Sequence, residues 1–250
     1  MIDRTEIEKA LRVFVKGFAE VRGRTWPYLQ TRTGDLWRLH DAPRKTSRGY
    51  RREEWIGRNI DIRSADAAIR AGVISHFAVC SLLTESDSVE SMKSGFRDMG
   101  YRQTGSEPLF VHRLKRVPRV TCPAEIRIMK TEADAALFAA ATRTRQVDAS
   151  VLRDAPYRQY LAFVGDELVG RVRSINTPEG QWCSDMFVEP RYRRRQIGRA
   201  LLAQMLRDDR RGGADWNVLL ASHAGAMLYP TLGYTQLGTL YIFVPKRYSA

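Results

Sequence analysis

The sequence predicts an α/β protein built from two similar halves, and three observations support this prediction. The chain has 250 residues with 44% hydrophobic and 10% aromatic content, so one large domain or two small ones can bury a core. Segments typical of strands alternate with segments typical of helices, most clearly between residues 125 and 250. A short pattern also occurs twice at an offset of 133 residues, which is the mark of an internal repeat.

The repeat joins a glycine to a strand-like segment. GYRQTGSEPLFVH begins at Gly100 and GYTQLGTLYIFVP begins at Gly233, with Gly, Tyr, Gln, Gly, Phe and Val in register. HFAVCSLL and then SVESMKSGFRDMG precede the first copy, and WNVLLAS and then HAGAMLYPTLG precede the second. Each copy is therefore expected to form a strand, a short helix ending at the glycine, and then a strand with a hairpin partner. Duplication explains this shared order better than chance does.

The boundary between the halves is expected in RLKRVPRVTCPAE, which has two prolines and a basic cluster. The predicted domains are 1–115 and 125–250, with a linker over 116–124. In the second domain the expected order is a strand in EIRIMK, a helix capped by Thr131, a hairpin turning at Gly165-Asp166, a strand in QWCSDMFV, and a helix from Ile197 to Arg211.

The first domain has weaker patterns. They predict a helix over about 3–18, a strand in DLWRLH, a long basic loop in APRKTSRGYRREEW, and a helix in SADAAIRAG. No glycine-rich turn joins a strand to a helix between Leu36 and Ala71.

The net charge of +13, with positive charge in both halves, favours anionic ligands, nucleic acid or acidic surfaces. A basic surface without a special partner is the plain alternative. The loop Arg44–Arg52, with Tyr50 and Trp55 nearby, keeps open a second functional class, a non-catalytic protein that binds nucleic acid or ribosomes. Against that class, the sequence has no RRM, KH or helix-turn-helix pattern.

The residues do not indicate a metal-binding, disulfide-rich, membrane-spanning or secreted protein. The three cysteines and four histidines are scattered without paired metal-ligand spacing, so neither a metal site nor a disulfide framework is expected. No apolar run approaches the ~20 residues that span a bilayer, and the N-terminus lacks a signal-peptide core. A cytoplasmic location without a membrane partner is the expectation.

The stretch VEPRYRRRQIGRALL, Val188–Leu202, places five arginines just before a predicted helix. The start of a helix already carries partial positive charge, so such crowding points to a bound anion there. A strand, a turn, Gly198 and then a helix is the order that aims free N–H groups at a phosphate, with Arg193, Arg195 and Arg199 as charged partners. Neither a Walker loop nor a GxGxxG pattern is present. A solvated basic helix face is the alternative.

This stretch resembles the acyl-CoA loop of the GNAT superfamily of N-acetyltransferases. That loop follows a strand ending in V-x-P and reads R/Q-x-x-G-x-G/A, and Arg195, Gly198 and Ala200 fill its three defined places. AMLYPTLGY also resembles the family's final helix, and the resemblance covers Glu125 to Arg247. It implies the GNAT fold, a mixed and mostly antiparallel central sheet flanked by helices, here in tandem with a degenerate N-terminal copy. It also implies acetyl-CoA as cosubstrate.

The same resemblance implies a set of site residues. Two carry the chemistry: Tyr229 as general acid and Asp185 as candidate base, since Trp182 stands where some members have a glutamate. The main chain of the strand end would pair with the pantetheine arm, the arginine loop would hold the pyrophosphate, and Ser222 would contact the cofactor. The cofactor residues are thus Met186, Phe187, Val188, Arg193, Arg194, Arg195, Gln196, Ile197, Gly198, Arg199, Ala200 and Ser222. Arg194 and Gln196 replace glycines that are optional in the family.

The implied reaction is direct attack of a primary amine on the thioester in a ternary complex. The amine, of pKa about 10, loses a proton, and the departing thiolate, whose acid has a pKa of about 8.5, gains one. The acceptor is expected to be a small-molecule or peptide amine. The N-terminal half would wall off the acceptor groove or form a homodimer contact, and its loop Arg44–Arg52 would favour an acceptor with negative charge.

Overall fold

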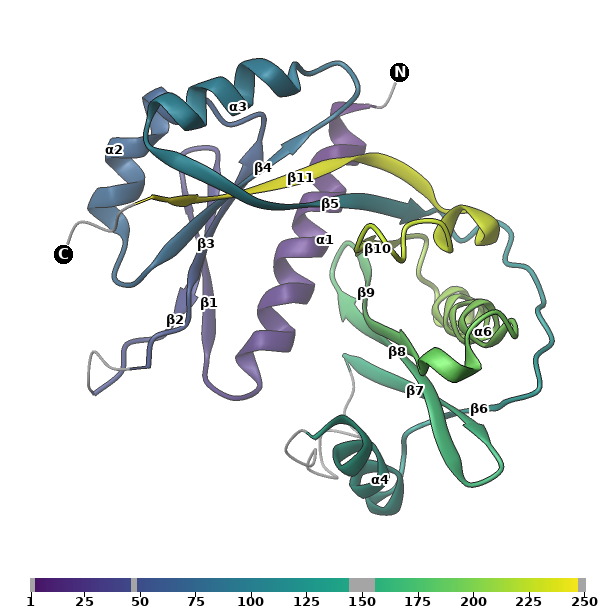
Figure 1. Cartoon of the computed structure of the whole chain (residues 1–250). Helices are drawn as coiled ribbons and strands as arrows, with labels where there is room; N and C mark the ends of the chain where they lie inside the picture. Colours follow the sequence, from purple (N-terminus) through teal and green to yellow (C-terminus); the bar gives the residue numbers. More distant parts are fainter. Residues whose placement is uncertain (1–2, 46–48, 144–155, 247–250) are drawn as a thin grey trace. The chain divides into compact units, whose positions relative to one another are not determined.

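The computed structural model describes residues 3–45, 49–143 and 156–246, and these form two compact units (Figure 1). Unit 1 comprises Met1–Leu109, Ala221–His223 and Gln236–Ala250, and unit 2 comprises Phe110–Leu220 and Ala224–Thr235. The chain therefore leaves unit 1, forms unit 2, and returns to unit 1 for its last strand.

Unit 1 is a sheet in the strand order β1-β2-β3-β4-β11-β5 with three helices. Neighbours β1 to β3 pair antiparallel, β3 and β4 pair parallel, and β11 lies antiparallel to β4. Its core centres on Trp55, Phe77 and Tyr101, with Phe96 stacked on Phe243 at 3.9 Å between ring centres. The elements are α1 (Arg4–Gly23), β1 (Tyr28–Thr33), β2 (Leu36–Asp41), β3 (Glu53–Arg58), α2 (Ile62–Gly72), β4 (Phe77–Leu83), α3 (Val89–Asp98), β5 (Tyr101–His112) and β11 (Thr235–Pro245).

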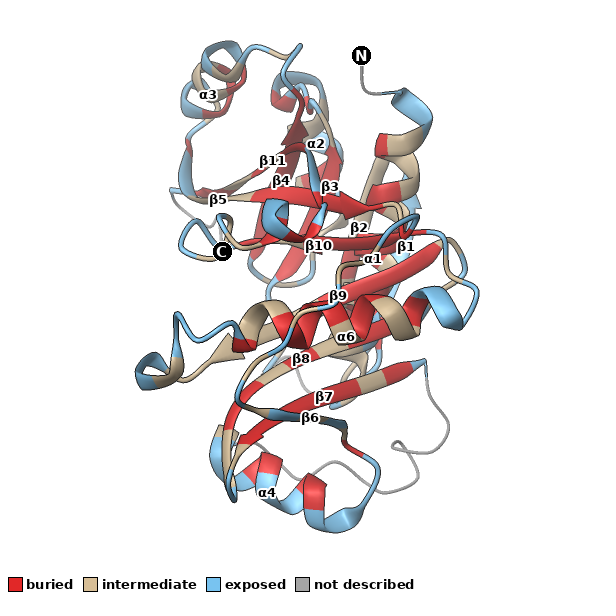
Figure 2. Ribbon diagram, turned by 90° about the vertical axis from the view of Figure 1, so that its right-hand side faces the viewer, coloured by how far each residue is buried: buried red, intermediate tan, exposed pale blue. Residues whose placement is uncertain are grey.

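The strands of unit 2 follow the order β10-β9-β8-β7-β6, and among them only β9 and β10 pair parallel. The helix α6 packs on β7, β8 and β9 with its buried side, while its outer side is of intermediate exposure up to the exposed Arg210 and Arg211 (Figure 2). The elements are β6 (Glu125–Ile128), α4 (Glu132–Thr142), β7 (Tyr157–Val164), β8 (Glu167–Thr177), β9 (Gly180–Val188), η1 (Pro190–Tyr192), α6 (Ile197–Arg211), β10 (Asn217–Leu220) and η2 (Tyr229–Leu232).

The predicted fold class is confirmed: mixed and mostly antiparallel strands are flanked by helices. Local predictions in the second half hold closely. The helix α6 spans Ile197–Arg211, and the Thr131 side chain accepts a hydrogen bond from Asp134 N at 3.1 Å to cap α4. The hairpin turns at Gly165, whose φ of +58° is the left-handed conformation that this turn requires.

The first half departs from the prediction in two places. The loop predicted over residues 42–55 ends earlier than expected, because β3 begins at Glu53. The strand β1 was not predicted at all. Both Glu53 and Glu54 are buried in β3, and because they are charged the sequence pattern did not indicate a strand there. They are tolerated because Arg38 Nε binds Glu53 at 2.9 Å and the Tyr28 hydroxyl donates to Glu54.

The segments after the two glycines also differ from the prediction. Both β5 and β11 are single unbroken strands, so the expected hairpin partners are wrong. The expected helix over 223–233 is a series of turns that ends in the short 3-10 helix η2. Pro230 has no N–H to donate, which prevents a regular helix through this segment. Gly100 and Gly233 keep their predicted place as stops, with φ of +76° and +95°.

The compact units do not follow chain order as the predicted domains 1–115 and 125–250 do. The division falls at Leu109, within β5, and β11 belongs mainly to unit 1, where it pairs with β4 from Thr239 to Phe243. Each unit nevertheless contains three successive antiparallel strands, a helix and then a parallel strand: β1-β2-β3-α2-β4 and β7-β8-β9-α6-β10. The duplication itself stays a prediction.

Candidate active site

The strand β9 separates from its parallel neighbour β10 part-way along its length. Within the described chain, the two strands pair only at Asn217 with Gln181 and at Val218 with Trp182, while β9 continues to Val188. The main chain of β9 beyond Trp182 is therefore left without a β10 partner. This opening in the sheet includes the predicted pantetheine-binding residues Met186, Phe187 and Val188.

A β-bulge lies on the other edge of the same segment. Arg171 of β8 pairs with Phe187, but Arg173 pairs with Ser184, so two residues of β9, Asp185 and Met186, stand opposite one residue of β8. Asp185 adopts a φ of +53°. Bulges with a left-handed residue turn the strand and re-aim its main-chain groups, and they are common beside active sites.

The loop after β9 presents free N–H groups to solvent. Arg194 and Gln196 both have φ of +63°, so they adopt the left-handed conformation although neither is glycine, at a cost of about 1–2 kcal/mol each. No side chain caps α6, and its first helical bond runs from Ala200 N to Gln196 O. The N–H groups of Ile197, Gly198 and Arg199 thus stay available for a bound anion.

Three of the five arginines in this region are held by the protein. Arg191 forms an ion pair with Glu167, and Arg193 Nε donates to the Val188 carbonyl at 3.0 Å. Arg199 donates to Gln196 Oε1 at 3.0 Å, close to the helix start.

The remaining two, Arg194 and Arg195, are exposed, and neither has an acidic partner among the described residues. The Arg195 guanidinium lies 5.4 Å from the centre of the Tyr192 ring. These two guanidinium groups are the ones that the fold leaves for a ligand.

Gly198 packs against β9. A Cβ added to Gly198 would stand 3.0 Å from Met186 Cε and 3.6 Å from Val188 Cγ2. The missing side chain therefore lets the start of α6 approach the opened strand. Ala200 is also buried.

Tyr229, the predicted general acid, lies in η2 with 6% of its surface exposed. Its ring contacts Phe110 at 5.7 Å and Tyr234 at 5.6 Å between ring centres. Burial, and then the nearby Cys183, raise the pKa of its hydroxyl, which keeps it protonated. Within the described chain the hydroxyl makes no hydrogen bond, whereas the Tyr234 hydroxyl donates to Asn217 Oδ1 at 2.7 Å.

Asp185, the candidate base, is held by two arginines. Arg171 Nε donates to one carboxylate oxygen at 2.8 Å, and Arg173 Nη2 donates to the other at 3.3 Å. To accept a proton from an amine, Asp185 would have to give up one of these charge-assisted hydrogen bonds. The two arginines were not singled out from the sequence, although their i, i+2 spacing in VGRVRSI places them on one face of the strand.

Ser222 lies in the segment Ala221–His223, which belongs to unit 1. All the other predicted site residues lie in unit 2. The contact of Ser222 with the cofactor stays a prediction.

A buried polar network joins α6 to three strands of unit 2. Asp209 of α6 is 1% exposed and accepts hydrogen bonds from Arg158 at 2.7 Å, Ser174 at 2.8 Å and Asn217 at 2.7 Å. These donors come from β7, β8 and β10. Burial raises the pKa of Asp209 to about 6, against the opposing effect of the Arg158 charge. The network fixes α6 across the sheet, and no pattern in the sequence indicated it.

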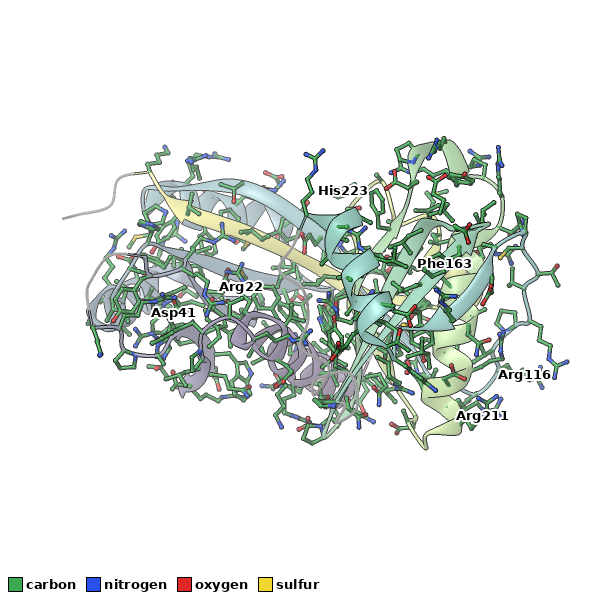
Figure 3. The ribbon with its side chains drawn as sticks, turned by 90° about the horizontal axis from the view of Figure 1, so that it is seen from below. Arg22, Asp41, Arg116, Phe163, Arg211 and His223 are labelled. Carbon is green, nitrogen blue, oxygen red and sulfur yellow. The ribbon has the colours of Figure 1, made fainter. Side chains whose placement is uncertain are left out.

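Two arginines of the basic loop of unit 1 are held by one carboxylate. The Asp41 carboxylate is buried and binds Arg44 at 2.9 Å and Arg51 Nε at 2.7 Å (Figure 3). Burial favours a higher pKa for Asp41, but the hydrogen bonds from Arg51 and Arg44 outweigh it and lower the pKa. These contacts hold the loop together and leave it one positive charge in excess of Asp41, so a role of the loop toward nucleic acid or an acidic acceptor stays a prediction. Lys45 precedes residues 46–48, which lie outside the described residues.

The geometry of unit 2 agrees with a match to a known family. Residues 156–236 match the family model described as an acetyltransferase (GNAT) domain. This segment contains the opened strand, the arginine loop, α6 and Tyr229. Residues 156–236 of the chain therefore form a GNAT acetyltransferase domain.

Solved GNAT structures share the fold of this protein over nearly its whole length. A GCN5-related N-acetyltransferase from Kribbella flavida is 17% identical, with a TM-score of 0.61 over 94% of this chain and 96% of its own. A putative GNAT-family acetyltransferase from Novosphingobium aromaticivorans is 16% identical, with a TM-score of 0.55 over 95% and 97%. A functionally unknown conserved protein from Staphylococcus epidermidis is 14% identical, with a TM-score of 0.61 over 88% and 95%.

No curated protein matches this GNAT chain. Among the described residues, no three His, Cys, Asp or Glu side chains are grouped so as to hold a metal ion. None of the described helices has the length and apolarity needed to cross a membrane.

Proposed function

We propose that this protein is an acetyl-CoA-dependent N-acetyltransferase that transfers the acetyl group to a primary amine by direct attack in a ternary complex. The observation that carries the proposal is the opening of β9 from β10 directly beside the uncapped start of α6. An extended thioester arm and a diphosphate are the two parts of acyl-CoA, and these two features are suited to them.

The diphosphate would bind at the start of α6. The N–H groups of Ile197, Gly198 and Arg199 point out of the helix, and Arg194 and Arg195 add positive charge without acidic partners of their own. The pantetheine arm would then lie along Met186–Val188 as an added strand, donating to and accepting from the free main chain.

The reaction forms one bond and breaks another. The amine nitrogen attacks the thioester carbon, the N–C bond forms, and the C–S bond breaks to release the CoA thiolate. Main-chain N–H groups at the bulge would stabilise the negative charge that develops on the carbonyl oxygen. Tyr229 supplies the proton to sulfur, which its unpaired and protonated hydroxyl is suited to do.

The amine must also lose a proton. Asp185 is the candidate base from the sequence, but its two arginine partners favour a positioning role. We propose that the proton leaves through water and that Asp185 holds Arg171 and Arg173 in place.

The test combines binding and turnover on the full chain. Calorimetric titration with CoA should give a well-defined affinity, and acetyl-CoA with a panel of amines should release free thiol. Arg195→Glu should weaken CoA binding at least tenfold, because it reverses a charge at the diphosphate site. Arg116→Glu is the matched control: it makes the same change on an exposed arginine of the linker (Figure 3) and should bind CoA like the wild type. Equal weakening by both variants, or no CoA binding by the wild type, would contradict the assignment.

A further inference from the structure

The two faces of the unit 2 sheet differ in what covers them. A Cβ added to Gly170 of β8 would stand 3.0 Å from Leu201 of α6, and Ser174 Oγ donates to Asp209 of α6. Gly170 and Ser174 therefore face α6. Since successive residues of a strand point to opposite faces, Arg171 and Arg173 face the other side.

The helix α4 lies over that other side, toward the outer strand. Arg127 of β6 is in register with Leu161, which is in register with Arg171, so the three residues share a face. Arg127 binds Asp134 of α4 at 3.0 Å. The strands β8 and β9 bring a second charged cluster to the same face.

This second cluster, which we call the Arg171 cluster, consists of Arg171, Arg173 and Asp185. All three side chains are partly buried, with 22%, 13% and 21% of their surfaces exposed. One carboxylate is shared by two guanidinium groups, so the cluster keeps one excess positive charge. In contrast, Arg127 and Asp134 form a pair that is balanced in charge.

The Arg171 cluster also has hydrogen-bond donors left over. Arg171 uses Nε on Asp185, and Arg173 uses Nε on Gln159 and Nη2 on Asp185. Within the described residues, both Nη atoms of Arg171 and Nη1 of Arg173 have no hydrogen-bond partner. None of these three is among the fully buried unpaired atoms, so each keeps some exposed surface.

Ser184 gives an independent sign of an unfilled site. Its Oγ is fully buried, and the described chain offers it no hydrogen-bond partner. Ser184 is in register with Arg173, so it belongs to the same face, one residue before Asp185. Buried polar atoms are rarely left unpaired without a functional reason.

We propose that the Arg171 cluster binds an anionic oxygen group, a carboxylate or a phosphate, on the acceptor amine. The inference rests on the proposed function. In that function the diphosphate binds on the face of the sheet that α6 covers, and the thioester reaches the bulge of β9 through the opening between β9 and β10. The acceptor then approaches from the opposite face, where the free guanidinium donors lie beside Asp185. The acceptor class is an amine that carries an acidic group, such as an amino acid or a phosphorylated amine.

The experiment compares acceptors that differ only in charge. The pairs are β-alanine with its amide, and phosphoethanolamine with ethanolamine, each measured for kcat and KM with acetyl-CoA. The wild type should prefer one or both anionic members by at least tenfold in kcat/KM, and the pair that shows the preference identifies the group. Arg171→Gln should abolish that preference through a higher acceptor KM, with the KM for acetyl-CoA unchanged.

Arg127→Gln is the matched control. Both arginines lie on the same face, each against an aspartate and over a phenylalanine ring, at 4.2 Å for Arg127 and 4.6 Å for Arg171. The control should keep the wild-type preference for the anionic member. Equal kcat/KM for both members of each pair in the wild type, or an unchanged preference in Arg171→Gln, would overturn the proposal.

A binding measurement separates this inference from the proposed function. N-acetyl-β-alanine and its amide are titrated calorimetrically into the wild type and Arg171→Gln, and the acetylated phosphoethanolamine pair is treated likewise. Binding of an anionic member alone, lost in Arg171→Gln, supports the anion site even if no amine is acetylated, in which case only the proposed reaction fails. Equal binding of both members in both pairs, or no binding of any, overturns the anion site whatever the CoA titration shows.

Discussion

The absent side chain of Gly198 faces the Met186 methyl group: a Cβ at residue 198 would stand 3.0 Å from Met186 Cε. The helix whose first N–H groups are proposed to bind the diphosphate thus touches the strand that would bind the thioester arm. This contact couples the two parts of the proposed cofactor site, and it changes how residue 198 should be tested.

For Gly198, we expect alanine and glutamate to behave differently. Gly198→Ala should lower the free energy of unfolding by about 1 kcal/mol, because the end of the Met186 side chain can move aside. Gly198→Glu would direct a carboxylate against Met186 and Val188 and should destabilise the fold by several kcal/mol. Urea denaturation measures both. Wild-type stability of Gly198→Glu would show that the side chain turns toward solvent.

For Tyr229, removal of the hydroxyl should affect catalysis rather than stability. Tyr229→Phe should lower kcat on the order of 10²-fold while leaving CoA affinity nearly unchanged. Because burial raises the pKa of this hydroxyl above its usual value near 10, kcat should not fall between pH 7 and 9 through its ionisation.

Tyr234→Phe is the control for that measurement. The Tyr234 ring centre lies 5.6 Å from that of Tyr229, and its hydroxyl donates a buried hydrogen bond to Asn217. Removing that hydrogen bond should lower the free energy of unfolding by about 1 kcal/mol and leave kcat unchanged. Equal effects of the two variants on kcat would show that Tyr229 acts only through packing.

For Asp185, the asparagine variant distinguishes a general base from a residue that positions Arg171 and Arg173. If Asp185 holds Arg171 and Arg173, Asp185→Asn should lower the free energy of unfolding by about 1–3 kcal/mol. With an acceptor amine that carries no acidic group, the variant should show the same pH dependence of kcat as the wild type. If Asp185 is a general base, its removal should instead lower kcat about 10²–10⁴-fold and change the acidic limb of the rate profile. A pH–rate profile measured on both proteins decides between them.

For Asp209, we expect stability to depend on pH. Its pKa is about 6 in the folded protein and about 3.9 in an unfolded chain, so the folded state holds the proton more tightly. The stabilisation is complete below about pH 4 and is lost as pH rises through 6, by about 3 kcal/mol in total.

Asp209→Asn lacks this titration, so the stability of the wild type relative to the variant should fall between pH 4 and pH 7. Denaturant unfolding at a series of pH values measures the difference. Asp35→Asn removes an exposed carboxylate and should follow the wild-type curve. A constant difference between the wild type and Asp209→Asn would exclude the raised pKa.

For the number of cofactor sites, calorimetry should find one CoA per chain. In unit 1, β3 and β4 pair over six positions from Glu53 with Phe77 to Arg58 with Leu82, so no opening corresponds to that between β9 and β10. The Asp61 carboxylate caps the start of α2 and would repel a phosphate there. Two sites of similar affinity would refute the view that the N-terminal half has no cofactor of its own.

The sequence by itself determined what depends on local chemistry. The arginine loop, Gly198 and the apolar stripe of α6 lie within fifteen residues, and their order alone predicts a helix start made for an anion. Thr131, Gly165 and Gly233 likewise direct the chain through side-chain caps and left-handed turns that involve only near neighbours. The superfamily could be identified from these local features.

Only the tertiary structure decided what depends on residues brought together from separate strands. The burial of Glu53 and Glu54 requires Arg38 and Tyr28, and the network at Asp209 draws on three strands. The pairing of Asp185 with Arg171 and Arg173 follows from a register and a bulge that no local pattern specifies. Charge in a sequence does not reveal its partner, so the contacts of Asp185 with Arg171 and Arg173 could not be predicted from local patterns.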